Sequence, residues 1–589
     1  MLLNLLYVTI KIALITTTMI IQKYKRTFLP SDFKLTDWSS VQPFYDQLLA
    51  RDIHSVEQLK ALLTDWSELE GMLEEDAGWR YIHASRDTTD PKAKENYEYY
   101  VTAILPHLEP VTNELQKKVL AAKDLSSLRQ ESAFDILVKK IENNIRCYRE
   151  ENITIQTDIQ LNKQKFAIIS SAMTVEIAGK ETTLQQAATH LEDLDRSFRK
   201  EVYDKIQQRR MQDKDKLNEL YSTLIRQRHQ LALNAGFENF REYAFVAMHR
   251  FDYTPQDCFT FHEAVREAIV PLLNELAADR KKTLGLAQLQ PFDHAVDRAG
   301  RAPLRPFADA AELIAKAIKV FESLDPCVAS CLRTMQQMGH LDLDSRKGKA
   351  PGGYNYPLDE TAVPFIFMNA TATLQDMLTL FHEVGHAVHS FETHILPLNA
   401  FKHCPSEIAE LASMSMELLT MPYWSVFFPN QEDLHRAQKE HLMHVMSCLP
   451  WIAAIDAFQH WVYTHPYHTV EERAQNWDRI FSSFSDTITD WTGYEEAKAH
   501  LWQKQLHLFE VPFYYIEYAI AQLGAIGVWK NAQANPKQAL ADYLNALKLG
   551  YTRSIAKVYQ TAATRFDFSR EHIHSLAQFV RKAWNDLTV

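Results

Sequence analysis

Apolar side chains recur at steps of three and four residues along most of this chain, which predicts a mainly helical protein. Between residues 36 and 150, one such segment reads VEQLKALLTDWSELEGMLEE, with apolar positions at Leu59, Leu62, Leu63 and Trp66. Residues 191–229 keep the helical spacing but are highly charged, which predicts a solvated pair of helices. Almost every segment after residue 370 follows the helical pattern again.

The helical pattern is interrupted in three places. Residues 153–184 alternate in polarity and contain the turn signal Ala178-Gly179-Lys180, which predicts one small hairpin. Residues 284–307 collect prolines and polar side chains and predict a connecting loop. Residues 345–370 begin as a Gly/Pro loop and end in PFIFMN, where we predict an edge strand from Phe365 to Asn369. An exposed strand edge can bind the main chain of an extended peptide.

Composition supports a large helical protein and restricts the classes of function. The 589 residues include only 15 glycines and 22 prolines, fewer turn formers than a sandwich, a barrel or a disordered chain would need. The formal net charge of −12 argues against a nucleic-acid binder, which normally carries a basic excess.

The cysteine pattern indicates the redox state of the cellular compartment. Six cysteines are scattered along the chain without a CxxC pair, which favours a reducing environment, and we expect the protein to be cytoplasmic. Cys327 and Cys331 lie one helical turn apart, and we interpret them as two small buried residues.

The first 21 residues are mostly apolar but fit neither a signal peptide nor a spanning helix. Their positive charges lie inside and after the apolar run, and no A-x-A-like cleavage site follows. Lys11 interrupts the roughly 20 apolar residues that a spanning helix needs. We expect residues 1–18 to be an upstream extension with Met19 as the true start. No other stretch is long and apolar enough to span a membrane, and we expect no stable membrane insertion.

The strongest chemical signal is HEVGH, which begins at His382 inside TATLQDMLTLFHEVGHAVHSF. Thr373 and Asp376 form a capping-box pattern that predicts a helix start just before it. His382 and His386 lie one helical turn apart, so both imidazoles can reach one zinc ion at about 2.0–2.1 Å. Glu383 lies beside them, where it can take a proton from water on the metal.

A bare HExxH can also arise by chance, because this chain has 24 histidines. The alternative is an ordinary helix with two histidines on its polar face. The context favours a zinc site, since the opposite face of the helix is apolar. Gly385 lies in mid-helix despite a cost of about 1 kcal/mol relative to alanine, which predicts the close approach of another element.

A catalytic zinc ion needs a third protein ligand and one open position. The pattern HExxHxxGxxH is excluded, because His389 and Glu392 occupy its glycine and third-histidine positions. The next predicted helix, SEIAELASMSMELLTM, supplies the carboxylates Glu407, Glu410 and Glu417. Spacing alone does not choose among them, and each can equally be a solvated carboxylate.

A second candidate region runs from His507 to Tyr518. If this segment is one helix, His507, Tyr514 and Tyr518 share a face, although Pro512 can instead open a new helix. The alternative is an aromatic helix packed in the core.

Several segments together resemble the oligoendopeptidase F and thimet oligopeptidase family of zinc peptidases, most closely its oligoendopeptidase F side. They are GGY within RKGKAPGGY, PFIFMNATATLQDMLTLFHEVGHAVHSF, PSEIAELASMSMELL, IDAFQHWVYTHPYHTVEERAQNW and HLFEVPFYYIEYAIAQLGAIGVW. The resemblance covers residues 22–585 and is strongest from 345 to 530.

The resemblance implies a mainly α, zincin-like fold. A small β element would lie next to the active site, and two largely helical halves would enclose a deep substrate groove. We expect an N-terminal helical domain with a small hairpin over residues 19–200 and a zinc metallopeptidase catalytic domain over residues 201–589.

The resemblance also assigns site residues. The family pattern of a glutamate, a serine three residues later and a second glutamate seven residues after the first falls on Glu410, Ser413 and Glu417. By resemblance, Glu410 is the third zinc ligand, and Glu417 is a candidate to orient a ligand imidazole.

Similar family members use a histidine and tyrosine cluster to hold substrate and to donate to the oxyanion. Matching the tyrosine spacing assigns His507, Tyr515 and Tyr518 to this cluster, whereas the first tyrosine of the thimet-type pattern falls on Val511. We place Tyr514 beside them as a supporting residue.

Two further residues are expected beside the metal or the substrate. Tyr354, in the GKAPGGY loop, either folds over bound substrate with that loop or belongs to a structural turn. His389 lies one turn after His386 on the predicted zinc helix.

We therefore expect an endopeptidase with one zinc ion per chain that hydrolyses short oligopeptides by activating water. Oligopeptides are the expected partners. An exopeptidase on a related helical zinc fold and a peptide-binding scaffold with an inactive site remain as alternatives.

Overall fold

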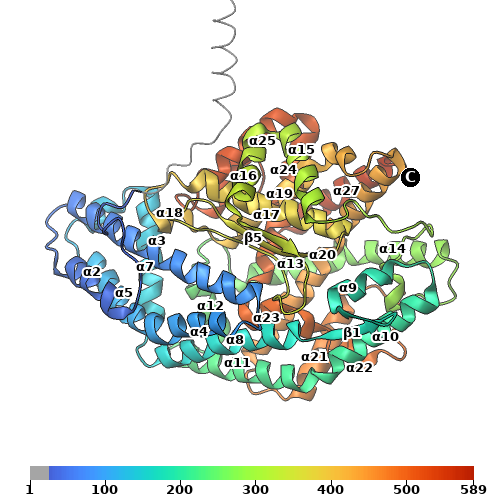
Figure 1. Cartoon of the computed structure of the whole chain (residues 1–589), viewed down its shortest axis with the longest axis horizontal. Helices are drawn as coiled ribbons and strands as arrows, with labels where there is room; N and C mark the ends of the chain where they lie inside the picture. The colour runs from blue at the N-terminus through green and yellow to red at the C-terminus, as the bar shows by residue number, and fades with distance from the viewer. Residues whose placement is uncertain (1–24, 589) are drawn as a thin grey trace, which may run out of the picture.

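The computed structural model describes residues 25–588 and confirms a mainly α protein with small sheets. The predicted N-terminal extension, residues 1–18, lies outside the described residues. In Figure 1 the N-terminal helices lie to the left, and strand β5 (Phe365–Ala370) and helix α17 (Leu374–Thr393) lie near the centre.

The N-terminal part is helical. Its elements are α2 (Trp38–Ala50), α3 (Val56–Arg86), α4 (Pro91–Tyr99), the π-helical turn η1 (Tyr100–Ile104), α5 (Leu105–Leu120), α6 (Leu125–Leu128), α7 (Ser132–Cys147) and α8 (Asn152–Ser171). A hairpin of β1 (Thr174–Ile177) and β2 (Lys180–Thr183) then leads into α9 (Leu184–Ala188) and the 3₁₀ turn η2 (Thr189–Glu192).

The middle of the chain continues with helices up to residue 338. They are α10 (Arg196–Gln212), α11 (Lys214–Asn234), α12 (Phe240–Ala247), α13 (Pro255–Ala268), α14 (Val270–Thr283), the 3₁₀ turn η3 (Pro291–Asp293), α15 (Ala310–Leu324) and α16 (Pro326–Met338). Strands β3 (Leu341–Asp344) and β4 (Tyr354–Tyr356) precede β5 and α17.

The C-terminal part is again helical. It comprises α18 (Asn399–Lys402), α19 (Ser406–Thr420), η4 (Met421–Val426), α20 (Gln431–Thr464), α21 (Val470–Phe484), α22 (Glu495–Ala499), η5 (Leu501–Lys504), α23 (Leu506–Glu510), α24 (Tyr515–Ala534), α25 (Pro536–Leu547), α26 (Ile555–Thr561) and α27 (Arg570–Asp586).

The hairpin prediction is confirmed only for its second half. Strands β1 and β2 pair antiparallel around Ala178 and Gly179, both at positive φ. Residues 152–171 instead form helix α8, which buries Ile159, Asn162 and Phe166 at steps of three and four. The β-branched residues of this segment alternate with polar ones, and this alternation suggested a strand. The buried positions, however, follow the helical period.

Two predictions about exposure need correction. The charged segment 191–229 does form the helix pair α10 and α11, but α11 buries one face that includes Leu217, Leu224 and Arg228. Cys331 is buried as expected, whereas Cys327 is exposed because it lies in the first turn of α16. The predicted loop at 284–307 is confirmed, and it contains only the short turn η3 and an isolated bridge from Leu289 to Thr489.

The small sheet next to α17 has the order β3-β5-β4. The prediction that Phe365 to Asn369 is an edge strand is wrong, because β5 pairs parallel with β3 on one side and antiparallel with β4 on the other. Its residues are nearly all buried, as a central strand requires. Among the described strands, β4 is the edge that faces the candidate site.

Apolar packing forms two large clusters among the described residues. One lies within residues 29–141 and is completed by Leu398 and Phe401, while the other gathers residues between 136 and 580. The division at residue 200 stays a prediction. The prediction that no later stretch is long and apolar enough to span a membrane needs correction. Among the described helices, α20 alone meets that length and composition, and 67% of its apolar window is buried inside the protein.

A buried charge pair fixes the loop between β3 and β4. The Lys349 ammonium is fully buried and lies 2.8 Å from Asp342 Oδ1, and it also donates to the carbonyl oxygens of Asp342 and Asp344. Asn369 donates to the carbonyl oxygens of Ala350 and Gly352 in the same loop. These contacts hold the start of β4 against β5.

We expect Asp342→Asn to destabilise the protein by about 3–5 kcal/mol, because it leaves the Lys349 ammonium buried without its counter-charge. Burial favours a raised pKa for Asp342, but Arg346, Lys349 and Arg86 outweigh it and lower the pKa. The stabilisation is therefore present above the unfolded carboxyl pKa of about 3.9 and is lost as the pH falls further. Urea denaturation of the wild type and the variant measures the difference, and an equal stability at pH 7 would contradict it.

Candidate metal centre and active site

Helix α17 begins at the predicted capping box and carries the HEVGH sequence. The Thr373 and Asp376 side chains each accept a backbone N–H of the other residue. The apolar face of the helix, including Leu378, Phe381 and Val388, is buried in the core. The same periodicity therefore leaves His382 and His386 on the opposite face.

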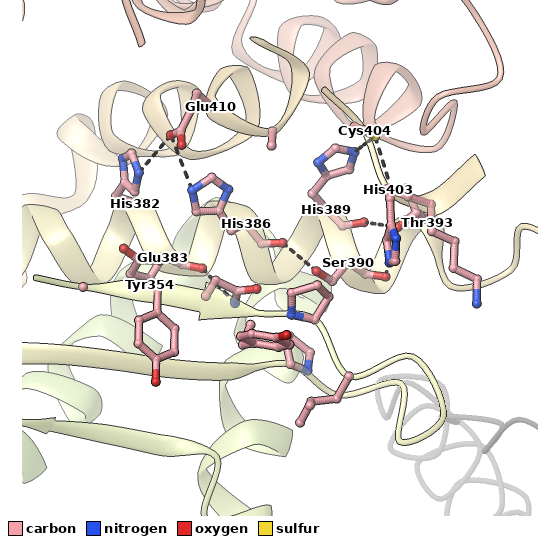
Figure 2. Close-up of a pocket in the computed structure, with 18 of the residues that line it drawn as sticks. Tyr354, His382, Glu383, His386, His389, Ser390, Thr393, His403, Cys404 and Glu410 are labelled. Carbon is pink, nitrogen blue, oxygen red and sulfur yellow. Dashed lines mark hydrogen bonds and ion pairs between the residues drawn. The ribbon is translucent and has the colours of Figure 1, made fainter. Parts of the chain in front are cut away.

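Three side chains converge above α17. His382 Nε2 lies 3.1 Å and His386 Nε2 lies 3.4 Å from Glu410 Oε2, which helix α19 contributes. Figure 2 shows both imidazoles pointing toward this carboxylate. The three ligand atoms lie within 4.8 Å of one another, a separation at which they could hold one metal ion.

The close approach that Gly385 predicts is present. A β-carbon at this position would lie 2.6 Å from Ser413 Cα and 2.7 Å from the Ala412 carbonyl oxygen. No real side chain tolerates such contacts with backbone atoms. The glycine therefore lets α19 pass directly over α17 and brings Glu410 to the two histidines.

Hydrogen bonds orient the three side chains. Glu417 Oε1 lies 2.8 Å from His382 Nδ1, so a proton on Nδ1 leaves Nε2 free to bind a metal. The Ser413 hydroxyl donates to Glu410 Oε2 at 2.8 Å, and the Tyr514 hydroxyl donates to Glu410 Oε1 at 2.6 Å. Of the three carboxylates on this helix, Glu410 faces both histidines, Glu417 lies behind one of them, and Glu407 is buried elsewhere beside Arg250.

The pKa values of the two carboxylates nearest the histidines, Glu410 and Glu383, shift in opposite directions. Burial favours a raised pKa for Glu410, but the adjacent imidazoles of His386 and His382 outweigh it and hold the pKa well below its usual range. Burial raises the pKa of Glu383. Its Oε2 atom is buried and has no hydrogen-bond partner among the described residues, so it is available to accept a proton.

A relay of hydrogen bonds fixes the tautomer of His507. The Trp451 indole N–H donates to Gln505 Oε1 at 3.2 Å, and this orients the amide so that Gln505 Nε2 donates to His507 Nδ1 at 2.8 Å. The ring proton of His507 is then on Nε2, 3.1 Å from the Tyr518 hydroxyl oxygen. Burial lowers the pKa of His507 to about 4, so the ring is neutral at pH 7.

The three tyrosines that follow His507 differ in whether they line the candidate cavity. The helix is interrupted between α23 and α24, where Phe513 adopts a φ of 68°, so His507 and Tyr518 lie on two helices rather than one. Tyr514 and Tyr518 line the candidate cavity. Tyr515 does not line it. Its hydroxyl instead accepts a hydrogen bond from Trp451 Nε1 at 3.2 Å. The assignment of Tyr515 to the donor cluster by spacing stays a prediction.

One cavity of about 620 Å³ is lined by His382, Glu383, His386, Glu410 and His507 together with Tyr514 and Tyr518. Its walls come from α17, α19 and α23–α24 on one side and from β4 and α3 on the other. Tyr354 belongs to β4, where its ring stacks on Phe367 and its hydroxyl lies 2.6 Å from the Ser85 hydroxyl. His389 also lines the cavity, and its Nε2 lies 3.5 Å from Cys404 Sγ.

Residues 189–578 match peptidase family M3, and residues 28–148 match the peptidase M3 N-terminal domain. The chain belongs to peptidase family M3. The resemblance found in the sequence is therefore confirmed. The two matches together cover most of the described M3 chain.

Individual relatives agree with the family. The M3 chain is 24% identical over 371 residues to an oligoendopeptidase F homolog of Borreliella burgdorferi, covering 61% of this chain and 60% of the relative. It is 22% identical over 385 residues to the oligopeptidase PepF of Bacillus subtilis, covering 63% and 54%. These alignments span less than two thirds of both curated relatives.

Solved structures share the fold over nearly the whole chain. The structure of PZ peptidase A with an inhibitor has a TM-score of 0.90 at 26% identity and covers 95% of this chain and 99% of that one. An oligoendopeptidase F from Enterococcus faecium has a TM-score of 0.59 at 15% identity, over 93% and 91%, and shares the fold alone.

The sequence did not reveal every residue of the site. Trp451 and Gln505 form the hydrogen-bond relay that fixes the tautomer of His507, and no sequence motif identifies either residue. Asp359 and His403 form a charged pair at 2.9 Å in the cavity wall, contributed by loops at two distant places in the sequence. Such contacts depend on tertiary packing rather than on spacing.

We expect Gly385→Ala to push α19 away from α17, with a loss of metal affinity and about 1–3 kcal/mol of stability. Metal analysis after dialysis and thermal unfolding measure the two effects. Gln375→Ala, on an exposed part of the same helix, is the control and should change neither. A Gly385→Ala variant with unchanged metal content would show that the close approach is not required.

Proposed function

We propose that this M3 chain is a zinc-dependent endopeptidase that hydrolyses short oligopeptides. The observation that carries the proposal is the convergence of His382 Nε2, His386 Nε2 and Glu410 Oε2 beside the unpartnered carboxylate of Glu383. Cytoplasmic location belongs to the same proposal. It is supported by six cysteines, all within the described residues, that form no disulfide there.

The donor set fits zinc. Two imidazole nitrogens and one carboxylate oxygen are a ligand set of catalytic zinc sites, which keep a fourth position for water or substrate. Zinc, when bound, would act as a Lewis acid that acidifies water and polarises the scissile carbonyl. Glu417 supports this set by holding the Nδ1 side of His382.

Glu383 is the proposed general base. It follows His382 directly on α17, is 5% exposed and has one oxygen without a partner among the described residues. Burial raises its pKa, which makes the carboxylate a better proton acceptor than an exposed one. Glu383 would take a proton from the attacking water and later deliver it to the leaving amine.

Tyr518 is the proposed donor to the developing oxyanion, and His507 orients its hydroxyl group. The relay from Trp451 through Gln505 places a hydrogen bond from His507 on the Tyr518 oxygen, which leaves the hydroxyl hydrogen of Tyr518 available for substrate. Tyr514 is occupied in donating to Glu410 and so serves the metal ligand. A neutral His507 needs no proton exchange to fill this role.

The shape of the cavity supports short peptides as substrates. Residues from Gly353 to Asp359, which include edge strand β4, line one wall and offer main-chain groups to an extended peptide. The histidines of α17 lie opposite, and elements from both ends of the chain close the sides.

The sharpest test is a series of quenched-fluorescent peptides of increasing length, blocked at both ends. We expect cleavage of blocked short peptides, loss of turnover with a chelator and recovery with zinc. Cleavage of only unblocked termini would favour the exopeptidase alternative, and peptide binding without any turnover would favour an inactive scaffold.

Glu383→Gln should retain zinc and lower kcat by about 10²–10⁴-fold, because the amide cannot accept the proton. Metal content and peptide hydrolysis are measured on the same preparation. Turnover at the wild-type rate would remove Glu383 from the role of base.

Tyr518→Phe should lower kcat by about 10²–10³-fold with little change in KM, because it removes a donor that acts mainly in the transition state. Tyr515→Phe is the matched control: it removes a hydroxyl that lies outside the cavity, and kcat should stay close to that of the wild type. A reversed pattern would assign the donor role to Tyr515.

A further inference from the structure

A second group of metal-binding side chains lies between helices α13 and α20. Cys258 and His262 lie four residues apart on α13, and Asp456 and His460 lie four residues apart on α20. Each pair therefore presents both members on one face of its helix, and the two faces meet. None of these four residues lines the cavity that holds His382.

The ligand atoms of this group are already close together. Those of Cys258, Asp456 and His460 lie within 4.8 Å of one another. His460 Nε2 is 3.3 Å from Asp456 Oδ2, and His262 Nε2 is 2.8 Å from the same oxygen. The arrangement thus brings a thiol, a carboxylate and an imidazole to one point, with a second imidazole holding the carboxylate.

The group is buried and incompletely hydrogen-bonded. Cys258 is 2%, Asp456 is 0% and His460 is 4% exposed. Among the described residues, Asp456 Oδ1 and His460 Nδ1 have no hydrogen-bond partner, and His460 Nε2 has only the 3.3 Å contact with Asp456 Oδ2. Buried polar atoms are nearly always satisfied in folded proteins, and an orphaned set of them points to a missing water or ion.

The surroundings favour an ion over a cluster of waters. Aromatic rings enclose the group, with Phe259 and Phe513 against His460 and Phe484 against His262. A thiolate and a carboxylate together balance a divalent cation, so the loaded group carries no net charge in this apolar shell.

We propose that Cys258, Asp456 and His460 bind a structural zinc ion, separate from the active-site metal, with His262 positioning the Asp456 carboxylate. Thiolate, imidazole and carboxylate are all zinc ligands, and the mixture of soft sulfur with nitrogen argues against calcium or magnesium. The unpartnered Oδ1 of Asp456 offers a further donor atom. The ion would join α13 to α20 and thereby brace the long helix that also supplies Trp451 to the active-site relay.

Metal stoichiometry tests the proposal on the full chain, purified without a metal-binding tag and loaded with zinc. We expect two zinc ions per wild-type chain, one in the double variant His382→Ala with His386→Ala, and none when Cys258→Ser is added to that variant. Because the double variant lacks the active-site histidines, this count does not depend on the proposed peptidase function. A double variant that binds no zinc would overturn the proposal.

Cobalt substitution identifies the ligand type. The active-site set contains no sulfur, so a thiolate-to-cobalt charge-transfer band in the double variant reports the second site alone. The band should disappear in Cys258→Ser and persist in Cys331→Ser, the matched control, because Cys331 is equally buried in α16. A band that survives Cys258→Ser would contradict the assignment.

A second variant distinguishes loss of the zinc ion from misfolding of the protein. Asp456→Asn keeps the shape of the side chain and removes the anionic ligand, so it should lose the second zinc ion while circular dichroism still shows a folded helical protein. If Asp456→Asn is folded and keeps two zinc ions, Asp456 is not a ligand and the proposed site is wrong.

Discussion

The site is built on the direct contact between two helix backbones at Gly385. Helix α17 carries the two histidines and Glu383, and α19 carries Glu410 and Glu417. Only a residue without a β-carbon allows the Ser413 backbone to come so near. The distances from Glu410 to both imidazoles follow from this one contact, so every step of the proposed chemistry relies on it.

Around this contact, hydrogen bonds fix the side chains of His382 and Glu410. Glu417 holds His382 from behind, while Ser413 and Tyr514 hold the two oxygens of Glu410. Glu383 is the exception, because one of its oxygens is buried without a partner among the described residues. A site whose ligands are constrained and whose base is unsatisfied is organised for a reaction rather than for packing alone.

Local sequence rules recovered much of the helical framework and the centre of the site. The capping box at Thr373, the four-residue spacing of the histidines and the mid-helix glycine each have a local physical meaning, and the structure shows all three. The choice of Glu410 needed the family resemblance, because three carboxylates on one helix have the same local signal.

The errors arose where tertiary pairing decides. Whether β5 is central or at the edge depends on β3 and β4, which its own sequence does not specify. Helix α8 was missed because its β-branched residues imitate a strand pattern. Whether His507 and Tyr518 share one helix depended on Pro512, and the interruption at Phe513 places them on two helices, α23 and α24. The relay through Gln505 similarly joins α20 to a segment more than fifty residues later.

The position of β4 has a consequence for solubility. An unpaired strand edge on a protein surface can template the addition of strands from other chains and so promote aggregation. Here that edge faces inward across the cavity from α17, and its strand spans only Tyr354–Tyr356. The backbone groups that could receive a short peptide are thereby kept away from the sheets of neighbouring molecules.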